Sequence, residues 1–240
     1  IFRSYGLPVG ASPQPSGVGN VPHIHTAERI LHLFETMAAF TARERQPEWM
    51  KWLNVLAQHG GIATSRQLVE ERVTARELTA AVTEGRLLRP RRGVYALPSA
   101  PPTALAAVAG GGRLSCVSAA RSYGLWGGVD GRLHLRVPSH ATRLPADDSV
   151  RHWVDSDRHR ECWRVSVADC LRSVAACASR ETAVAVIDTA LSSGLVTLAT
   201  LNDVFAQQPR SVRAVVDQSR PGSDSGIESL VRQRLEFRGH

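Results

Sequence analysis

Residues 74–97 read TARELTAAVTEGRLLRPRRGVYAL, and the spacing of their apolar side chains changes at Gly85. Thr74 and Glu77 form the Thr-x-x-Glu capping box that starts a helix, and Gly85 is typical of its end. The inner face of this helix is marked by apolar residues at helical spacing: Leu78, Ala81 and Val82. After Gly85 the pattern is extended, and two short strands are expected to flank residues 90–93. A capped helix followed by a hairpin is the order expected in the second half of a winged helix-turn-helix.

The residues before this stretch complete the pattern. A first helix ends at the glycine pair 60–61, and its apolar face consists of Trp49, Trp52, Leu53, Leu56 and Ala57. Ile62 is expected in a short extended link, and Thr64 or Ser65 is expected to cap a second helix. The inward-facing residues of that second helix are Leu68 and Val69. Two helices, the capped helix and the hairpin predict a winged helix-turn-helix over residues 48–98.

The hairpin is rich in arginine, with Arg86, Arg89, Arg91 and Arg92 around one turn. Guanidinium groups bind phosphate through two parallel hydrogen bonds and enter narrow minor grooves. Arg76, near the start of helix 74–84, is expected to contact a base edge or a phosphate. The residues expected to touch DNA are Thr64, Ser65, Thr74, Arg76, Thr79, Arg86, Arg89, Arg91 and Arg92. An alternative for Arg86 and Arg89 is a surface ion-pair network with Glu70, Glu71 or Glu84.

The charge balance agrees with a polyanionic partner. The 240 residues include 29 Lys and Arg against 22 Asp and Glu, for a formal net charge of +7. Double-stranded DNA is therefore the expected partner, although an arginine-rich surface also occurs in proteins that bind no nucleic acid. A further alternative is a winged helix that binds protein instead of DNA.

Residues 1–47 contain Pro-Gln-Pro-Ser-Gly and no sustained periodicity, and they are expected to form a disordered or weakly helical leader. An alternative is that translation begins at Met37. Residues 98–102 indicate a linker. Apolar residues at helical and extended spacing follow in residues 103–208, which predict a compact, mainly helical α+β domain. The expected fold class is therefore α+β, with an N-terminal winged helix-turn-helix.

Several further elements are expected after the linker. Helices are expected at residues 103–109, 115–123, 168–179, 180–193 and 200–207, and extended segments at 133–137, 150–154 and 163–167. Residues 209–240 are expected to form a C-terminal helical segment, with an amphipathic helix at 227–237.

No cofactor or metal site is expected. Cys116, Cys162, Cys170 and Cys177 include no Cys-x-x-Cys pair and no histidine at zinc-finger spacing, so reduced thiols are expected. The group nearest to a ligand cluster consists of His152, Asp155, Asp157 and His159, which are expected to be surface residues. No nucleotide-binding or hydrolase motif is present. The sequence shows neither a secretion signal nor an apolar run of roughly 20 residues, so a cytoplasmic location without membrane contact is expected.

Residues 60–64, 89–97 and 114–120 resemble the AbiEi-type antitoxins of type IV toxin-antitoxin systems. They read GGIAT, RPRRGVYAL and LSCVSAA, and the resemblance extends over about Trp49 to Val215. It implies an N-terminal winged helix that binds an operator. It also implies a C-terminal domain that counters a nucleotidyltransferase toxin. An alternative role of the α+β domain is dimerisation, with a homodimer as the result.

Residues 225–235, SGIESLVRQRL, resemble the first helix of Vsr-like PD-(D/E)XK endonuclease domains. The resemblance implies that Glu228 is the acidic residue of that helix. Mg²⁺-dependent hydrolysis also needs carboxylates and a lysine on a following hairpin. The sequence stops at His240, so a truncated nuclease domain is expected, either in a fragment of a longer enzyme or as a natural remnant. The alternative role for Glu228 is an ordinary first-turn carboxylate favoured by the helix dipole.

Overall fold

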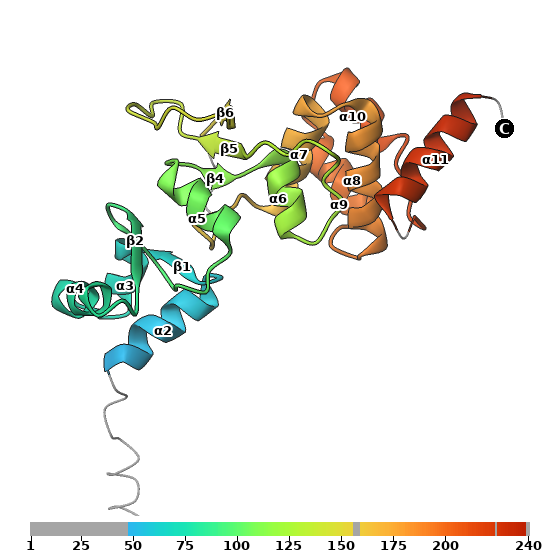
Figure 1. The fold of residues 1–240 in the computed structure, drawn as a ribbon. Helices are drawn as coiled ribbons and strands as arrows, with labels where there is room; N and C mark the ends of the chain where they lie inside the picture. Colours follow the sequence, from blue (N-terminus) through green and yellow to red (C-terminus); the bar gives the residue numbers. More distant parts are fainter. Residues whose placement is uncertain (1–47, 156–158, 224, 239–240) are drawn as a thin grey trace, which may run out of the picture. The chain divides into compact units, whose positions relative to one another are not determined.

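The computed structural model describes residues 48–155, 159–223 and 225–238. Its elements form an α+β fold, which confirms the expected fold class (Figure 1). The leader expected over residues 1–47 lies outside the described residues.

The first part of the described chain has the order of a winged helix-turn-helix. Its elements are α2 (Glu48–Gln58), β1 (Ile62–Thr64), α3 (Ser65–Glu70), α4 (Ala75–Thr83), β2 (Leu88–Arg91) and β3 (Val94–Ala96). The three strands form an antiparallel sheet in the order β1-β3-β2, so β2 is an edge strand. β2 includes Pro90, and its register with β3 is irregular between Leu88 and Arg91. The turn is therefore shorter than the expected residues 90–93, and an edge strand tolerates a proline because its N–H side can face solvent.

Side-chain caps set the two helices of the turn motif. The Thr64 side chain accepts from the backbone N–H of Gln67 at 3.3 Å, and the Gln67 side chain accepts from the backbone N–H of Thr64 at 2.8 Å. Thr74 and Glu77 make the same reciprocal contacts at the start of α4, so the expected capping box is confirmed. Each box satisfies two backbone N–H groups that a helix N-terminus leaves without partners.

The winged helix has a hydrophobic core of its own, which consists of Trp52, Val55, Leu56, Ala63, Leu68, Val73, Leu78, Ala81, Leu87 and Tyr95. Three residues expected on inner faces are exposed instead: Trp49 at 46%, Val69 at 60%, and Ala57. The buried residues of α2 are Trp52, Val55 and Leu56. Ala57 points away from them, and Trp49 lies in the first turn of α2, one turn before the first of these buried residues. Val69 is exposed because neighbouring helical positions point about 100° apart, and Leu68 takes the inward position in the short α3.

The second part of the chain combines a small mixed sheet with helices. Its elements are α5 (Pro102–Ala109), β4 (Arg113–Leu114), α6 (Cys116–Ser122), β5 (His134–Val137), β6 (Val150–Trp153), α7 (Val167–Cys177), α8 (Arg180–Ser192), α9 (Leu198–Phe205), α10 (Arg210–Val216) and α11 (Gly226–Phe237). β5 pairs antiparallel with β4 and parallel with β6. The extended segment expected at 163–167 contributes a single bridge, between Arg164 and Leu114, and α7 begins at Val167. The helix α10 lies within residues 209–240, which were expected to be helical, although no separate helix was delimited there. Its Val215 and Val216 belong to the core of this part.

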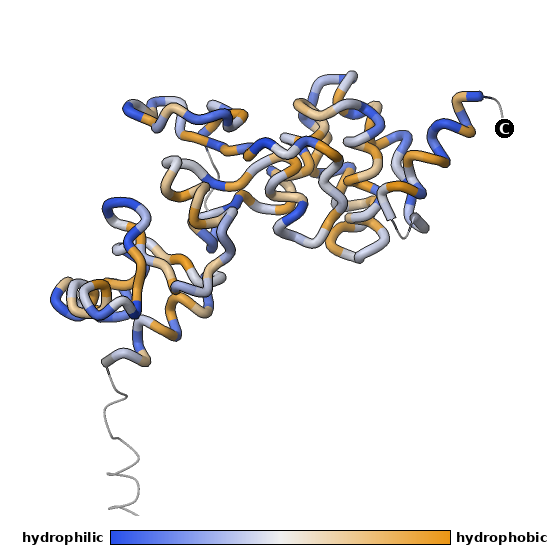
Figure 2. Tube along the Cα trace, viewed as in Figure 1, coloured by the Kyte–Doolittle hydropathy of each residue, from blue (hydrophilic) through white to orange (hydrophobic). Residues whose placement is uncertain are grey.

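α8 is buried along most of its length and packs against α7, α10 and α11 (Figures 1 and 2). Its contact with α11 is partly polar, because Asp188 is 0% exposed. The Asp188 carboxylate accepts hydrogen bonds from the Ser229 hydroxyl, from Arg232 Nη2 at 2.7 Å and from the backbone N–H of Arg220 at 2.7 Å. These donors compensate the charge that α8 carries into the interior.

Replacing Arg232 should therefore destabilise the fold strongly. Arg232→Leu leaves the Asp188 carboxylate buried without its cationic partner, and the expected loss is about 3–5 kcal/mol of unfolding free energy. Arg234→Leu is the matched control: the Arg234 side chain is 66% exposed in its pair with Glu181. An exposed pair of this kind contributes about 0–1 kcal/mol. Urea unfolding followed by circular dichroism measures both variants, and equal losses would contradict this account of Asp188.

Candidate nucleic-acid interface

The outer face of α4 is a shallow surface of small and polar side chains. It is lined by Ala75, Arg76, Thr79, Ala80, Thr83 and Glu84. The Thr79 and Thr83 hydroxyls donate to helix carbonyls one turn earlier, at 2.9 and 3.0 Å. Each hydroxyl oxygen keeps a free lone pair, and each methyl is available for contact with a thymine methyl. Small side chains on this face also allow α4 to approach the floor of a major groove closely.

Arg76 extends from this face near the N-terminus of α4. It is exposed, and within the described parts of the chain it forms no ion pair. The next carboxylate along the helix, Glu77, points back to accept from the Thr74 backbone N–H. This hydrogen bond lowers the pKa of Glu77 below its ordinary value of 4.5. Glu77 is thus occupied as a cap, which leaves Arg76 as the charged side chain of the exposed first turn.

The four arginines of the wing, residues 86–97, have different surroundings. Arg86 pairs with Glu84 and lies over the Trp52 ring, 5.7 Å from its centroid. The surface-network alternative therefore holds for Arg86 with Glu84. Arg89 lies over the Tyr95 ring at 5.8 Å and forms no ion pair with the described carboxylates. Arg92 is exposed at the hairpin turn, which is hydrophilic in Figure 2.

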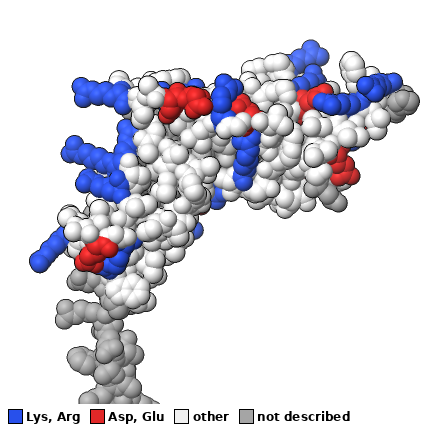
Figure 3. Space-filling model, in the orientation of Figure 1, with Lys and Arg blue, Asp and Glu red and all other residues white. Residues whose placement is uncertain are grey.

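Arg91 extends toward the turn after α5. A Cβ atom at Gly111 would lie 1.7 Å from Arg91 Nη1 and 2.9 Å from Leu144 Cδ2, so both side chains pack against this glycine. Gly111 has a φ of +80°, a backbone conformation that residues other than glycine rarely adopt. Leu144 follows Arg143, an exposed arginine that sequence reasoning missed because its loop lies far from the wing in sequence. Figure 3 shows Lys and Arg side chains projecting from the side where Figure 1 places α4 and the hairpin tip.

The remaining predicted contact residues lie at the starts of α3 and α4. The Thr64 and Thr74 side chains cap these helices, so their hydroxyls are already engaged. The Ser65 backbone N–H donates to the Gly93 carbonyl at 2.8 Å. This bond holds the start of α3 against the tip of the wing. The structure therefore brings Ser65 beside the wing, while Arg76 and Thr79 lie on the outer face of α4.

Polar contacts join the winged helix to the second part of the chain. Trp163 Nε1 donates to the carbonyl of His59 at 3.0 Å. The Arg160 carbonyl is 2.8 Å from His59 Nδ1 and accepts from Gln67 Nε2 at 2.9 Å. A Cβ atom at Gly60 would lie 2.9 Å from Trp163 Nε1, so the glycine permits this close approach. The end of α2 and the Gln67 side chain, which takes part in the capping box of α3, are thus both hydrogen-bonded to one segment, residues 160–163.

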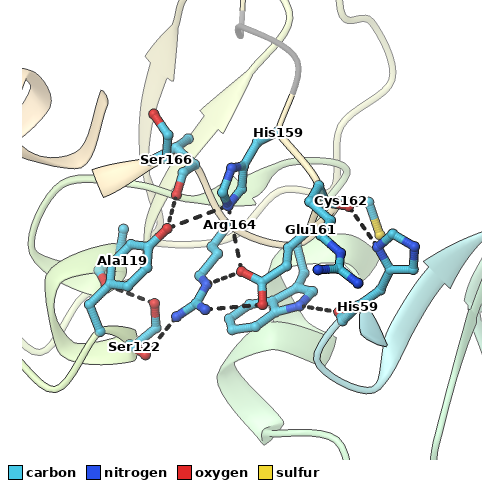
Figure 4. Close-up of polar contacts among 12 residues, drawn as sticks. His59, Ala119, Ser122, His159, Glu161, Cys162, Arg164 and Ser166 are labelled. Atoms are coloured by element: carbon cyan, nitrogen blue, oxygen red, sulfur yellow. Dashed lines mark hydrogen bonds and ion pairs between the residues drawn. The ribbon is translucent and has the colours of Figure 1, made fainter. Parts of the chain in front are cut away.

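Arg164, which follows the segment 160–163, contacts residues of the second part of the chain (Figure 4). Its guanidinium forms a bidentate pair with Glu161 and donates to the Ser122 carbonyl at 2.8 Å. It also lies over the Tyr123 ring at 4.0 Å from the centroid. The Tyr123 hydroxyl donates to the Val165 carbonyl, and burial raises the pKa of Tyr123 to about 12. A neutral tyrosine over a wide pH range keeps this donor in place.

The histidine and aspartate residues expected at the surface near residues 152–159 have separate partners. His152 Nε2 is 3.3 Å from His134 Nδ1, Asp155 accepts from Ser139, and His159 faces Glu161 at 3.5 Å. Asp157 lies outside the described residues. The structure places the three described residues in three different contacts, and His152 joins a group of cysteine and histidine side chains that sequence spacing did not reveal.

Glu228 lies in the first turn of α11, where its backbone N–H donates to the Ser225 hydroxyl at 3.2 Å. α11 packs on α8 through Ser229 and Arg232, which both donate to the Asp188 carboxylate, and Gly226 lies against Trp126. The opposite face leaves a stripe of apolar side chains exposed: Ile227, Val231 and Leu235. Among the described residues, no helix is long and apolar enough to cross a bilayer.

The order and packing of the elements from α2 to β3 define residues 48–97 as a winged helix-turn-helix-like module. Residues 51–98 match the family model described as "Transcriptional regulator, AbiEi antitoxin", and the match covers about a fifth of the 240 residues. Among solved structures, the RV2827C protein from Mycobacterium tuberculosis shows 17% sequence identity and a TM-score of 0.34 over 77% of this chain and 80% of that chain. Comparison with curated proteins gives no match.

The capping role of Glu77 predicts a pH-dependent stability. Because its pKa is lowered in the folded state, Glu77 stabilises the protein above its ordinary pKa of 4.5, and this contribution is lost as the pH falls through the folded-state pKa. Glu77→Gln should lower the unfolding free energy at neutral pH by about 0.3–1 kcal/mol, the range for a surface charge at a helix N-terminus. The difference between wild type and variant should shrink toward pH 3. Chemical unfolding at both pH values tests this, and a pH-independent difference would contradict it.

Proposed function

We propose that this protein is a DNA-binding transcriptional regulator. In this proposal α4 enters the major groove, and the wing contacts the adjacent backbone or minor groove. The observation that carries the proposal is a set of exposed arginines on one module that pair with no carboxylate among the described residues: Arg76 on α4, and Arg89 and Arg92 on the hairpin. The match of residues 51–98 to a transcriptional-regulator family supports the same conclusion.

The arginines of the hairpin and the arginine of α4 are expected to contact different parts of the DNA. Arg92 and Arg89 extend from a hairpin that has no helical surface to read bases, so they bind phosphate and position the module. Arg91 and Arg143 extend this positioning surface beyond the hairpin turn. Arg76 lies beside Thr79 on the face of α4, where a guanidinium can form two hydrogen bonds with guanine O6 and N7. Sequence preference therefore resides mainly in α4.

Substitution of these arginines separates positioning from recognition. Arg92→Ala should weaken binding to all duplexes alike and reduce the slope of log affinity against log salt by about 0.9, the effect of one phosphate contact. Arg76→Ala should cost about 1–3 kcal/mol on the preferred site and reduce the difference between that site and unrelated duplexes. Fluorescence anisotropy on a selected site and a scrambled site, at several salt concentrations, measures both effects.

The matched control is Arg234→Ala on α11, an exposed arginine outside the winged helix. It should leave affinity and salt slope unchanged. If Arg92→Ala and Arg76→Ala behave like this control, the proposed interface is wrong. Binding that does not respond to salt, or binding to no duplex at all, would favour a winged helix that recognises a protein.

We also propose that the second part of the chain serves partner binding, with a nucleotidyltransferase toxin as the partner that the antitoxin family implies, or a second copy of the chain. The exposed apolar stripe on α11 offers one surface for such contact. A nucleotidyltransferase gene adjacent in the genome, with copurification of the two products, would support the antitoxin role. Light scattering of the purified chain alone tests the homodimer.

A second candidate function is DNA targeting for a Vsr-like, Mg²⁺-dependent endonuclease. The observation that favours it is the packing of α11, which is anchored by polar groups and leaves its apolar face and Glu228 on the outside, as expected for a helix that begins a further domain. A product of the gene that includes such a domain should then nick duplex DNA with Mg²⁺, and Glu228→Gln should abolish nicking without reducing DNA binding. Absence of nicking by that product would reject this candidate.

A further inference from the structure

Four metal-ligating side chains from four different elements converge in the second part of the chain. They are Cys116 at the start of α6, His134 on β5, His152 on β6 and Cys177 at the end of α7, and their ligand atoms all lie within 4.8 Å of one another. His134 Nδ1 is 3.3 Å from His152 Nε2, and Cys177 Sγ is 3.8 Å from His134 Nδ1. The group lies outside the winged helix.

These separations fit one tetrahedral metal ion. Zinc binds histidine nitrogen at about 2.0–2.1 Å and cysteine sulfur at about 2.3 Å, so a tetrahedral site places two nitrogens about 3.4 Å apart and a nitrogen and a sulfur about 3.6 Å apart. The two printed separations, 3.3 and 3.8 Å, are close to these values. The sheet register explains the approach of the histidines, because Arg136 pairs with His152 and His134 shares the face of Arg136 on β5.

The surroundings of the group orient its ligands. His134 is buried, and its Nε2 lies 3.2 Å from Asp130 Oδ2, so Nδ1 faces the other three ligands. A carboxylate on the second nitrogen of a metal-binding histidine is the usual arrangement in zinc sites, because it fixes the ring and its tautomer. Cys116 has a φ of +49°, a backbone conformation that a non-glycine residue adopts at a cost. Such strain occurs at ligand clamps, where other interactions compensate it.

We propose that Cys116, His134, His152 and Cys177 bind one Zn²⁺ ion in a Cys₂His₂ site. Two thiolates and two imidazoles are a donor set typical of zinc, and four protein ligands leave no open position for substrate, so the site is structural. The ion joins the start of α6 and the end of α7 to the β5–β6 pair. Cys177 is exposed, so this edge of the site is accessible to exchange with solvent.

The test uses the full chain, expressed with zinc and purified under reducing conditions. We expect one zinc per chain by mass spectrometry of the metal content. Replacement by Co²⁺ should give the intense visible absorption of a tetrahedral ion and a thiolate-to-cobalt charge-transfer band. Chelation of the metal should lower the thermal unfolding midpoint. These readouts report the metal and the fold, and none depends on DNA binding.

Three variants test the assignment: one removes a ligand, one removes the carboxylate next to His134, and one is a control. Cys177→Ser removes an exposed ligand, so the Co²⁺ form should lose the charge-transfer intensity of one thiolate. This variant should also weaken zinc binding more than Asp130→Ala does. Asp130→Ala should weaken zinc binding by about 10- to 100-fold, the effect of losing an outer-sphere carboxylate. Cys162→Ser is the matched control: Cys162 lies outside the group, where its thiol contacts the Ile62 carbonyl. It should bind zinc like the wild type.

Three outcomes would overturn the proposal. The first is substoichiometric zinc together with no tetrahedral Co²⁺ spectrum in the wild type. The second is equal metal affinity in the wild type and Cys177→Ser. The third is a disulfide between Cys116 and Cys177 in the protein isolated without reductant and with thiols blocked at lysis, because a disulfide would remove both thiolate ligands.

Discussion

The strand pair β1–β3 is buried on both of its faces, and the position of the winged helix depends on this pair. Ala63 and Tyr95 face each other and belong to the core of the winged helix. Their neighbours Ile62 and Ala96 also pair and belong to the core of the second part of the chain. Alternate residues of a strand point to opposite faces, so one register places four side chains in two cores. A shift by one residue would exchange the two sets, which makes the register a strong constraint on the orientation of α4 and the wing.

Hydrogen bonds also hold the elements on either side of strands β1 and β3. Trp163 and Arg160 hold the end of α2, and the bond from Ser65 to Gly93 holds the wing against α3. These hydrogen bonds hold the elements that carry the proposed nucleic-acid surface, α4 and the hairpin, in fixed positions. A rigid support reduces the conformational entropy that is lost on binding, so more of the contact energy contributes to affinity.

Local features of the sequence predicted most of the winged helix. The Thr74–Glu77 capping box, the cap expected at Thr64 or Ser65, Gly85 and the change in periodicity predicted the order of helices and strands, because each depends on residues only a few positions apart. Features that depend on distant residues were not accessible in this way. The packing of Arg91 against Gly111 requires knowledge of how the turn after α5 lies beside β2. The cysteine and histidine group was missed because its four members come from separate elements and share no recognisable spacing. The helix α10 has a short apolar face whose burial becomes apparent only beside α8.

The edge strand β2 has a consequence for how the protein behaves in concentrated solution. An edge strand exposes backbone groups that can pair with another molecule and start aggregation. Pro90 removes one of these donors, the irregular register interrupts the straight edge, and arginines surround it with like charge. The same side chains that attract a polyanion thus repel a second copy of the hairpin, so the wing can remain uncovered without joining sheets edge to edge.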